Sequence, residues 1–162
     1  MDDHPGAVDR TAEAVTLVGD DLADDGLVLM VQGDEVLVAP DMIDPVVAAF
    51  SNTDAPVVNL ASPILDPTMQ DDTNVVKVAR ALDDRALFFS RAPIPSRART
   101  PISDMLQQTG VIGFSKTFLS IFLKLERTPL EIIEGIDMLR TLEHGYAIKI
   151  VTSGRPTIGV DT

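Results

Sequence analysis

The sequence predicts an α/β domain with a mixed, mostly parallel sheet, helices flanking the sheet and one inserted antiparallel hairpin. Short apolar runs bounded by turn residues alternate with stretches in which apolar residues recur at helical spacing. Two further apolar runs follow each other closely along the chain, which interrupts the alternation and indicates the hairpin. With 162 residues and 45% hydrophobic residues, the chain has enough apolar content for one globular domain.

The first part of the chain reads as helix, strand, helix, strand. Residues 8–22 show helical spacing, and residues 27–31 form a short apolar run that we expect to be a buried, parallel strand. Asp41 is a candidate N-cap for the second helix, with Pro45 in its first turn. Residues 57–61 predict the second strand.

The middle of the chain predicts the hairpin and then a loop. Residues 75–81 and 86–90 are separated by a short polar turn, as expected of two antiparallel strands. A proline- and arginine-rich stretch at 93–101 follows and predicts a long connection. Residues 110–114 then predict another strand.

The last part predicts two helices and a final strand. Residues 116–125 show helical spacing. Thr128 and Glu131 have the spacing of a capping box, and Gly145 provides a helix stop, so we expect one continuous helix between them. Residues 146–151 predict the last strand.

The composition excludes several classes of protein. There is no cysteine, which excludes disulfides and thiol chemistry and is consistent with a reducing cytoplasm. Two histidines are too few to suggest a histidine metal site, so any metal must be bound mainly by oxygen. The net charge of −12 disfavours a nucleic acid polymer as partner. No segment has the length of a membrane span, and the start lacks the pattern of a signal peptide.

Two acidic residues follow predicted strands at distant places in the sequence. Asp34 stands in V-Q-G-D-E and Asp161 in G-V-D-T. If the two strands are neighbours, both carboxylates reach the same edge of the sheet and can bind Mg²⁺ against nucleotide phosphates. From the spacing alone, an ordinary turn or capping role is the more frequent explanation for an acidic residue at such a position.

The order of motifs resembles that of the Kdo cytidylyltransferases, which are related to the acylneuraminate cytidylyltransferases. The motifs, in chain order, are V-Q-G-D-E (31–35), N-V-V-K-V (74–78), A-L-F-F-S-R-A-P-I-P (86–95), T-P-L-E-I-I-E (128–134), L-R-T-L-E-H-G (139–145) and G-V-D-T (159–162). The start, D-H-P-G-A-V-D-R (3–10), resembles a further family segment with several changes.

This resemblance implies a fold and an activity. The fold is nucleotide-diphospho-sugar transferase-like, with a Rossmann-like sheet in a single domain, residues 1–162. The activity is transfer of CMP from CTP to a 2-keto sugar acid, Kdo or a related sugar, with Mg²⁺ as cofactor and pyrophosphate as product, for lipopolysaccharide or other cell-surface polysaccharide synthesis. The resemblance also implies a cytoplasmic homodimer, with residues near 75–114 as the dimerisation insert.

The resemblance also implies roles for individual residues. Asp34 and Asp161 match the two magnesium-binding aspartates and are the expected catalytic residues. Gln32 and Arg91 match residues that contact the sugar acid, and Arg91 can pair with its carboxylate. Arg10 is retained from the nucleotide-side segment.

Several positions depart from the family pattern. The sugar-site histidine and tyrosine fall on Gln108 and Ile112, and a Glu-Gln pair falls on Asp137 and Met138. Asp137 therefore remains a candidate substrate contact, whereas Ile112 and Met138 cannot make the expected hydrogen bonds. These changes leave open which sugar acid is bound.

The family's phosphate-cradling N-terminal segment has no counterpart in this sequence, nor does the helix that follows G-V-D-T. Gly6 and Val8 also replace a serine and a threonine on the nucleotide side. We therefore expect a partial domain, clipped at both ends, with little transferase activity by itself.

Two other functions remain open. The chain can be a non-catalytic, truncated homologue that acts as a binding or assembly module, which the altered pocket positions favour. It can also be another nucleotidyltransferase, such as one that makes an NDP-sugar from a sugar 1-phosphate, although the G-V-D-T motif argues against this.

Overall fold

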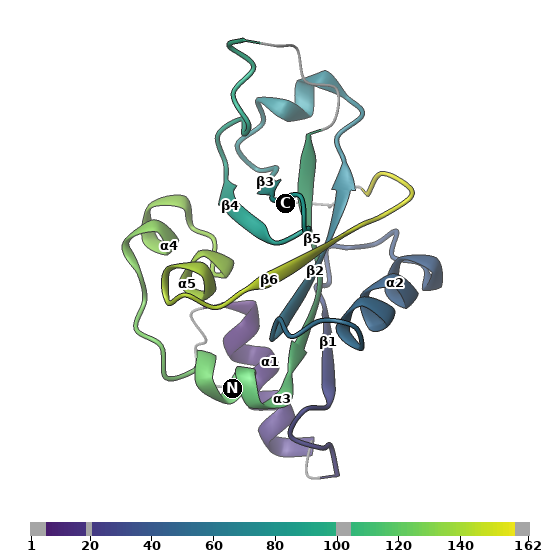
Figure 1. Cartoon of the computed structure of the whole chain (residues 1–162), viewed down its shortest axis with the longest axis vertical. Coiled ribbons are helices and arrows are strands. Elements are labelled where there is room, and N and C mark those ends of the chain that lie inside the picture. Colours follow the sequence, from purple (N-terminus) through teal and green to yellow (C-terminus); the bar gives the residue numbers. More distant parts are fainter. Residues whose placement is uncertain (1–5, 19–20, 100–104, 158–162) are drawn as a thin grey trace.

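The computed structural model describes residues 6–18, 21–99 and 105–157, which form a six-stranded sheet with helices on both faces (Figure 1). The elements, in chain order, are α1 (Ala7–Val18), β1 (Leu27–Val31), α2 (Pro40–Phe50), β2 (Val57–Pro63), the 3₁₀ helix η1 (Pro67–Gln70), β3 (Lys77–Arg80), β4 (Ala86–Ser90), β5 (Leu106–Ser115), α3 (Lys116–Phe122), α4 (Pro129–Glu134), α5 (Met138–Glu143) and β6 (Ile148–Thr152).

Strand β5 organises the sheet. The strand order is β4-β3-β5-β2-β6, and β1 also pairs with β5. Strand β2 pairs with β5 along its whole length and so occupies one edge of β5. Strands β1 and β3 therefore both pair with the other edge of β5. There β3 pairs with residues 106–107 and β1 with residues 111–115. The two strands therefore leave a gap between them along one edge of β5.

The sheet is mixed, as predicted, but the expectation that it is mostly parallel was wrong. Among the described strands, β2 and β6 form the parallel pair, whereas the other pairings are antiparallel. The predicted direction of β1 is corrected in the same way, because it runs antiparallel to β5. The expected burial of β1 was wrong too, because Met30 is its one buried residue and Val31 is exposed. A short apolar run contains no information about the direction of the neighbouring strand.

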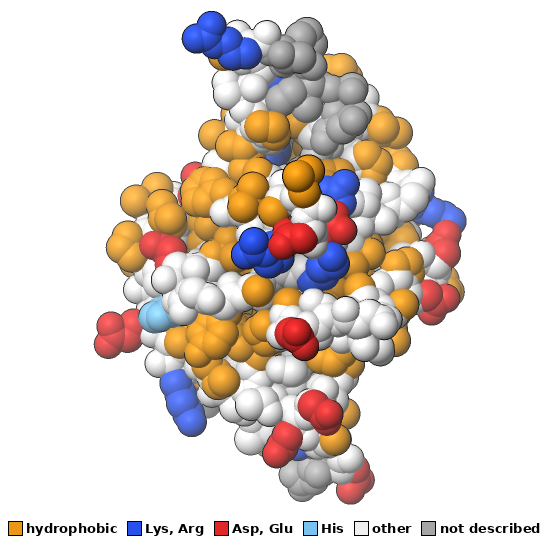
Figure 2. Space-filling model, viewed as in Figure 1, with side chains coloured by type: hydrophobic (Ala, Val, Ile, Leu, Met, Phe, Trp, Pro, Cys, Tyr) orange, Lys and Arg blue, Asp and Glu red, His pale blue; other side chains and the backbone are white. Residues whose placement is uncertain are grey.

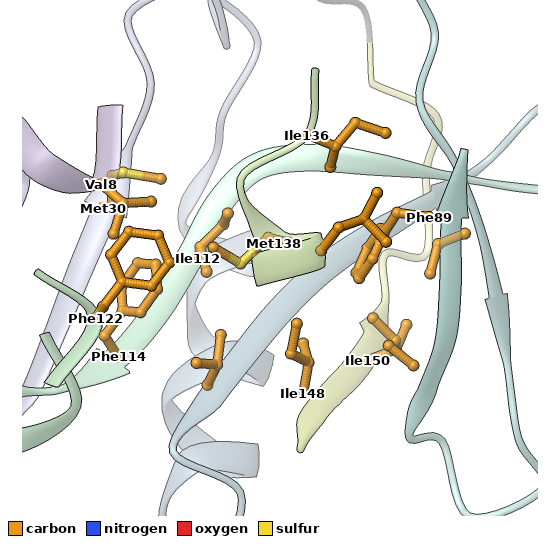
Figure 3. Close-up of a cluster of buried hydrophobic side chains, with 14 of the residues drawn as sticks. Val8, Met30, Phe89, Ile112, Phe114, Phe122, Ile136, Met138, Ile148 and Ile150 are labelled. Atoms are coloured by element: carbon orange, nitrogen blue, oxygen red, sulfur yellow. The ribbon is translucent and has the colours of Figure 1, made fainter. Parts of the chain in front are cut away.

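The helices cover the two faces of the sheet unequally. Helix α2 packs on one face, against β2, β5 and β6, with Met42 and Val46 buried. Helices α1, α3, α4 and α5 lie on the other side (Figure 1). There Val8, Phe114 and Met138 belong to the larger hydrophobic cluster (Figure 3). The cluster spans α1, α5 and the sheet, and it fixes the position of the segment between α4 and α5.

The predicted boundaries of the first helices need correction. The described part of α1 ends at Val18 rather than at residue 22. Helix α2 begins at Pro40 after an extended Ala39, so Asp41 lies in the first turn and is not the N-cap. Pro45 lies inside this helix rather than in its first turn. Proline at the first helical position needs no N–H partner, which explains the earlier start.

The hairpin is confirmed, and the strand after the loop is longer than expected. β3 and β4 pair antiparallel, and Asp84 in their turn adopts φ 61°. β5 begins at Leu106, four residues before the predicted start. The polar residues Gln107, Gln108 and Thr109 hide this extension, because a strand pattern needs apolar positions to be visible in sequence.

The single helix predicted between Thr128 and Gly145 is in fact two helices. The capping box is confirmed, since the Glu131 carboxylate accepts the backbone N–H of Thr128 at 3.2 Å. Helix α4 then ends at Gly135, which adopts the left-handed conformation with φ 65° and ψ 39°. Gly145, with φ 81°, ends α5 as predicted. The break at Gly135 redirects the chain so that Ile136 and Met138 are buried.

Charged side chains of both signs intermingle on the surface. Figure 2 shows Lys and Arg beside Asp and Glu near the middle of one face, with hydrophobic side chains around them. Three exposed or partly exposed ion pairs come from the hairpin turn: Arg80–Asp84, Arg85–Asp83 and Lys149–Asp84. Within the described ranges, no helix is both long and apolar enough to cross a membrane.

Candidate active site

The gap between β1 and β3 along β5 opens into a cavity of about 530 Å³. The chain lines it on both sides as it leaves β1 and as it approaches β3. The N–H of Gln32 donates to the Gly110 carbonyl at 3.0 Å, and the N–H of Gln108 donates to the Val76 carbonyl at 2.8 Å. Between these two bonds, the edge of β5 forms the floor of the cavity.

Gln32 lies directly on the floor of this cavity. A methyl group added at Gly110 would lie 2.6 Å from its Oε1 and 2.7 Å from its Cβ, so only glycine permits this approach. Gln32 and Asp34 also line a second hollow of about 430 Å³, where Arg10 and Thr11 of α1 meet the end of β1. The segment after β1 therefore lines two adjoining hollows.

Two consecutive carboxylates project from this segment. Asp34 is exposed, and the partly buried Glu35 accepts the backbone N–H of Gly110. Burial raises the pKa of Glu35; the Gly110 N–H opposes this shift, and the neighbouring Asp34 adds to it. Carboxylate oxygens of this kind suit Mg²⁺, so the donor set at the end of β1 fits a divalent cation.

The second predicted metal ligand, Asp161, lies outside the described residues. Within the part of the chain that the structure describes, no three His, Cys, Asp or Glu side chains come together as a metal cluster. The predicted convergence of Asp34 and Asp161 is therefore untested. Thr157, four residues before Asp161, lines the same cavity as Asp34.

Arg91 lines the opposite side of the cavity and is held firmly in place. Its Nε donates to the Glu134 carbonyl at 2.7 Å and its Nη1 to the Thr73 carbonyl at 2.8 Å. Its backbone N–H donates to the Glu134 carboxylate at 2.9 Å. Among the described residues, no carboxylate forms an ion pair with the guanidinium, so its charge is available to an anionic ligand.

Asp137 reaches the cavity from the break between α4 and α5. Burial raises its pKa to about 6; Arg140 opposes this shift, and Glu131 and Asp9 add to it. The carboxyl group of Asp137, which lines the cavity, therefore changes its ionisation near pH 6.

Besides Asp137, two of the departing sugar-site positions lie at the cavity and one does not. Gln108 lines it and donates to Asn59 Oδ1 at 2.9 Å, and Ile112 lines it as an apolar side chain. Met138 is fully buried in the core instead (Figure 3). The lost amide at position 138 therefore does not face the cavity.

A buried polar network in the wall of the cavity was not predicted from the sequence. The Gln107 amide donates to Ser62 Oγ at 2.8 Å and to the Thr157 carbonyl at 2.8 Å, and the hydroxyls of Ser62 and Thr157 lie 2.8 Å apart. Asn59 donates to the Thr109 and Val111 carbonyls where the β2–β5 register shifts. These small polar residues stand far apart along the chain, so no sequence pattern reveals the network.

Comparison with known proteins decides the family. The sequence profile of the family described as "Cytidylyltransferase" matches residues 2–150. This chain belongs to the cytidylyltransferase family.

Similar proteins include 3-deoxy-manno-octulosonate cytidylyltransferases from three bacteria. The relatives from Syntrophotalea carbinolica and Herminiimonas arsenicoxydans are each 38% identical over 99% of this chain, and that from Halorhodospira halophila is 37% identical over the same share. These alignments cover 66%, 67% and 66% of the relatives, so the chain spans about two thirds of their length.

A solved structure agrees with this placement. The CMP:2-keto-3-deoxy-manno-octonic acid synthetase complexed with CTP has a TM-score of 0.87 and 26% identity, covering 99% of this chain and 64% of that one. The predicted nucleotidyltransferase-like α/β fold is thereby confirmed.

The cytidylyltransferase fold brings most of the predicted site residues together. Gln32, Asp34, Arg91 and Asp137 line one cavity, although they are spread over more than a hundred positions of the sequence. Arg10 lines the adjoining hollow with Gln32 and Asp34. Their roles in binding stay predictions.

Proposed function

We propose that this cytidylyltransferase chain binds CTP and a 2-keto sugar acid at the β5 gap and transfers CMP to the anomeric hydroxyl of the sugar. Pyrophosphate is the other product. The sugar acid is Kdo or a close relative, used for lipopolysaccharide or another cell-surface polysaccharide. The observation that carries the proposal is the convergence of Gln32, Asp34, Arg91 and Asp137 on one cavity in a member of this family.

Each of the two adjoining hollows suits one of the two substrates. Arg10 and Thr11 line the space on the α1 side, which suits the nucleotide. Arg91 and Asp137 line the larger space, which suits the sugar acid, because a guanidinium pairs with a carboxylate and an acidic side chain accepts hydroxyl hydrogen bonds. Gln32 and Asp34 border both spaces, so the reacting groups would meet at the end of β1.

Asp34 is the described residue best placed to bind Mg²⁺, and Asp161 is its proposed partner. A divalent cation there would neutralise charge on the phosphates of CTP. Asp34 is exposed at the border of both hollows, as a ligand of a shared ion must be. Thr157, which stands four residues before Asp161 in the sequence, lines the same cavity as Asp34.

The cavity wall also bears on the choice of sugar. Ile112 offers an apolar surface, and Gln108 already donates its amide to Asn59. A sugar that needs a hydroxyl donor at position 112 would lose that hydrogen bond, which is costly in a closed site. We therefore propose that Kdo and Kdo analogues with fewer or altered hydroxyls compete for this site.

The remaining parts of the proposal concern assembly and location. We propose a homodimer formed through the region of residues 75–114 and a cytoplasmic reaction. A binding or assembly module is the second candidate, favoured by the apolar Ile112 at the cavity.

A pyrophosphate-release assay separates these functions. The chain is supplied with CTP, Mg²⁺ and Kdo, and binding of each substrate is measured in parallel by calorimetry. We expect binding of both substrates and slow, Kdo-dependent release of pyrophosphate that Arg91→Met reduces and Arg80→Met does not. Binding without release would favour the module, and absence of binding to either substrate would overturn the proposal.

A further inference from the structure

Lys77 has an unusual environment for a lysine. Its side chain is fully buried, and its ammonium donates to the backbone carbonyls of Asp72 and of Arg91, the latter at 2.9 Å. Burial lowers its pKa, whereas Asp72 and Asp71 oppose the shift. Among the described residues, no carboxylate lies within ion-pair distance of the ammonium. A buried cation held only by carbonyls is costly, and a methionine of similar length would fill the same space.

The two carbonyls belong to the two segments that border the cavity beside β3. Asp72 and Arg91 both line the cavity, whereas Lys77 lies behind them. The Arg91 guanidinium in turn donates to the carbonyls of Thr73 and Glu134. Lys77 therefore holds the backbone of Arg91, whose side chain lines the cavity.

The positive charge of Lys77 matters because the cavity wall carries more negative than positive side chains. The wall contains four carboxyl side chains, those of Asp34, Glu35, Asp72 and Asp137. Arg91 is the one Lys or Arg among the described residues that line it. An anionic ligand would meet net negative charge there, and a fixed cation directly behind Arg91 offsets part of that repulsion.

We infer that Lys77 is a positioning residue for recognition of the ligand carboxylate. It holds the Arg91 backbone in register with the Asp72 segment and adds positive charge behind the guanidinium. This inference rests on the proposed function, because it assigns the carboxylate of a sugar acid to the Arg91 side of the cavity. It assigns no contact between Lys77 and the ligand.

The test compares Lys77→Met with Arg80→Met in the 162-residue chain. Arg80 lies on the same strand but forms an exposed ion pair with Asp84, so its replacement is a matched control. Each variant is titrated calorimetrically with Kdo, with the carboxamide of Kdo, and with CTP and Mg²⁺. The carboxamide keeps the sugar and removes only the negative charge.

We expect Lys77→Met to bind Kdo about tenfold more weakly than the parent chain, with CTP binding unchanged. The carboxamide should bind equally to both, since the charge that Lys77 supports is absent. If Lys77 had only a structural role, Lys77→Met would bind all three ligands more weakly. Arg80→Met should match the parent throughout.

Two results would overturn the inference alone: unchanged Kdo affinity in Lys77→Met, or equal weakening of Kdo and its carboxamide. If Lys77→Met does not fold, as judged by circular dichroism, Lys77→Gln takes its place, because the amide keeps a donor without the charge. Loss of the fold in both variants would make Lys77 a purely structural residue and also overturn the inference. A parent chain that binds neither Kdo nor CTP would overturn the proposed function as well.

Discussion

The guanidinium of Arg140 and the carboxylate of Glu131 form a buried ion pair that joins α5 to α4. Nε of Arg140 donates to Oε2 of Glu131 at 2.8 Å, and Nη2 donates to Oε1 at 2.6 Å. The same guanidinium lies 4.3 Å from the centroid of the Phe122 ring. The pair spans the break at Gly135, so it fixes the segment that presents Asp137 to the cavity.

Removing Arg140 should destabilise the fold strongly. In Arg140→Met, the Glu131 carboxylate stays buried without its main partner, which typically costs about 3–5 kcal/mol. Urea unfolding followed by circular dichroism measures this loss. Arg127→Met is the matched control, because Arg127 pairs with the same carboxylate but its side chain is 54% exposed, and we expect a loss below about 1 kcal/mol. Equal losses in the two variants would contradict this account.

Gly135→Ala should weaken both the fold and the site. The left-handed conformation of Gly135 costs an alanine about 1–2 kcal/mol, although a Cβ there would meet nothing closer than 3.9 Å. Gly154→Ala, where a Cβ has open space and φ is not positive, should change stability little. Thermal melting compares the two. If Gly154→Ala lowers the melting temperature as much as Gly135→Ala does, the left-handed conformation does not explain why glycine stands at position 135.

Asp137 should make stability depend on pH. Burial raises its pKa from 3.8 to about 6 in the folded chain, so between these values the folded chain binds more protons there than the unfolded chain. The contribution of this residue to the free energy of unfolding therefore falls as pH rises from about 4 to 6 and stays low above 6. Asp137→Asn, which cannot ionise, should melt at a higher temperature than the parent chain at pH 8, with the difference shrinking toward pH 4.5.

Melting curves across that range check the sign. Asp44→Asn, at an exposed position of α2, serves as the control and should show no such trend. A melting difference for Asp137→Asn that stays constant from pH 4.5 to 8 would show that the carboxyl of Asp137 does not titrate abnormally.

Gly110→Ala should damage the cavity without unfolding the chain. The new methyl group would lie 2.6 Å from the Gln32 amide oxygen, so the side chain must move off the floor. The methyl group would also lie 2.7 Å from the Gln32 Cβ, so the backbone at the end of β1 must shift as well, and we expect a loss of stability of about 1–3 kcal/mol. Calorimetry should show weaker Kdo binding, by about tenfold for one lost hydrogen bond. Unaltered Kdo affinity would remove Gln32 from the sugar site.

Much of the fold was visible in the sequence because local patterns determine it. The hairpin and the Thr128 capping box were predicted correctly, because each depends on residues close together in the sequence. The bounds of the strand at 27–31 were also correct, but the expected burial was wrong, because Met30 is its one buried residue. The predicted direction of β1 was wrong, because its pairing with β5 depends on residues eighty or more positions away. The break at Gly135 was missed because a glycine inside a helical pattern can also continue the helix.

The site was predicted from motifs, and its supporting residues were not. Gln32, Asp34 and Arg91 stand in segments that resemble the family, so their shared cavity follows from the fold. Lys77 stands in one of the same segments, but its burial becomes apparent only when β3 is placed against Arg91. Predicting it required three-dimensional proximity between distant backbone carbonyls, which no periodicity encodes.

Calorimetric titration of CTP with Mg²⁺ tests the central claim most directly. The parent chain, Asp34→Asn, Asp161→Asn and the control Asp44→Asn are compared with and without the metal. We predict Mg²⁺-dependent binding of CTP to the parent and control, and binding at least about tenfold weaker in each of the other two variants. Absence of Mg²⁺-dependent heat in the parent chain, or unchanged affinity in Asp34→Asn, would contradict a nucleotide and metal site at the end of β1.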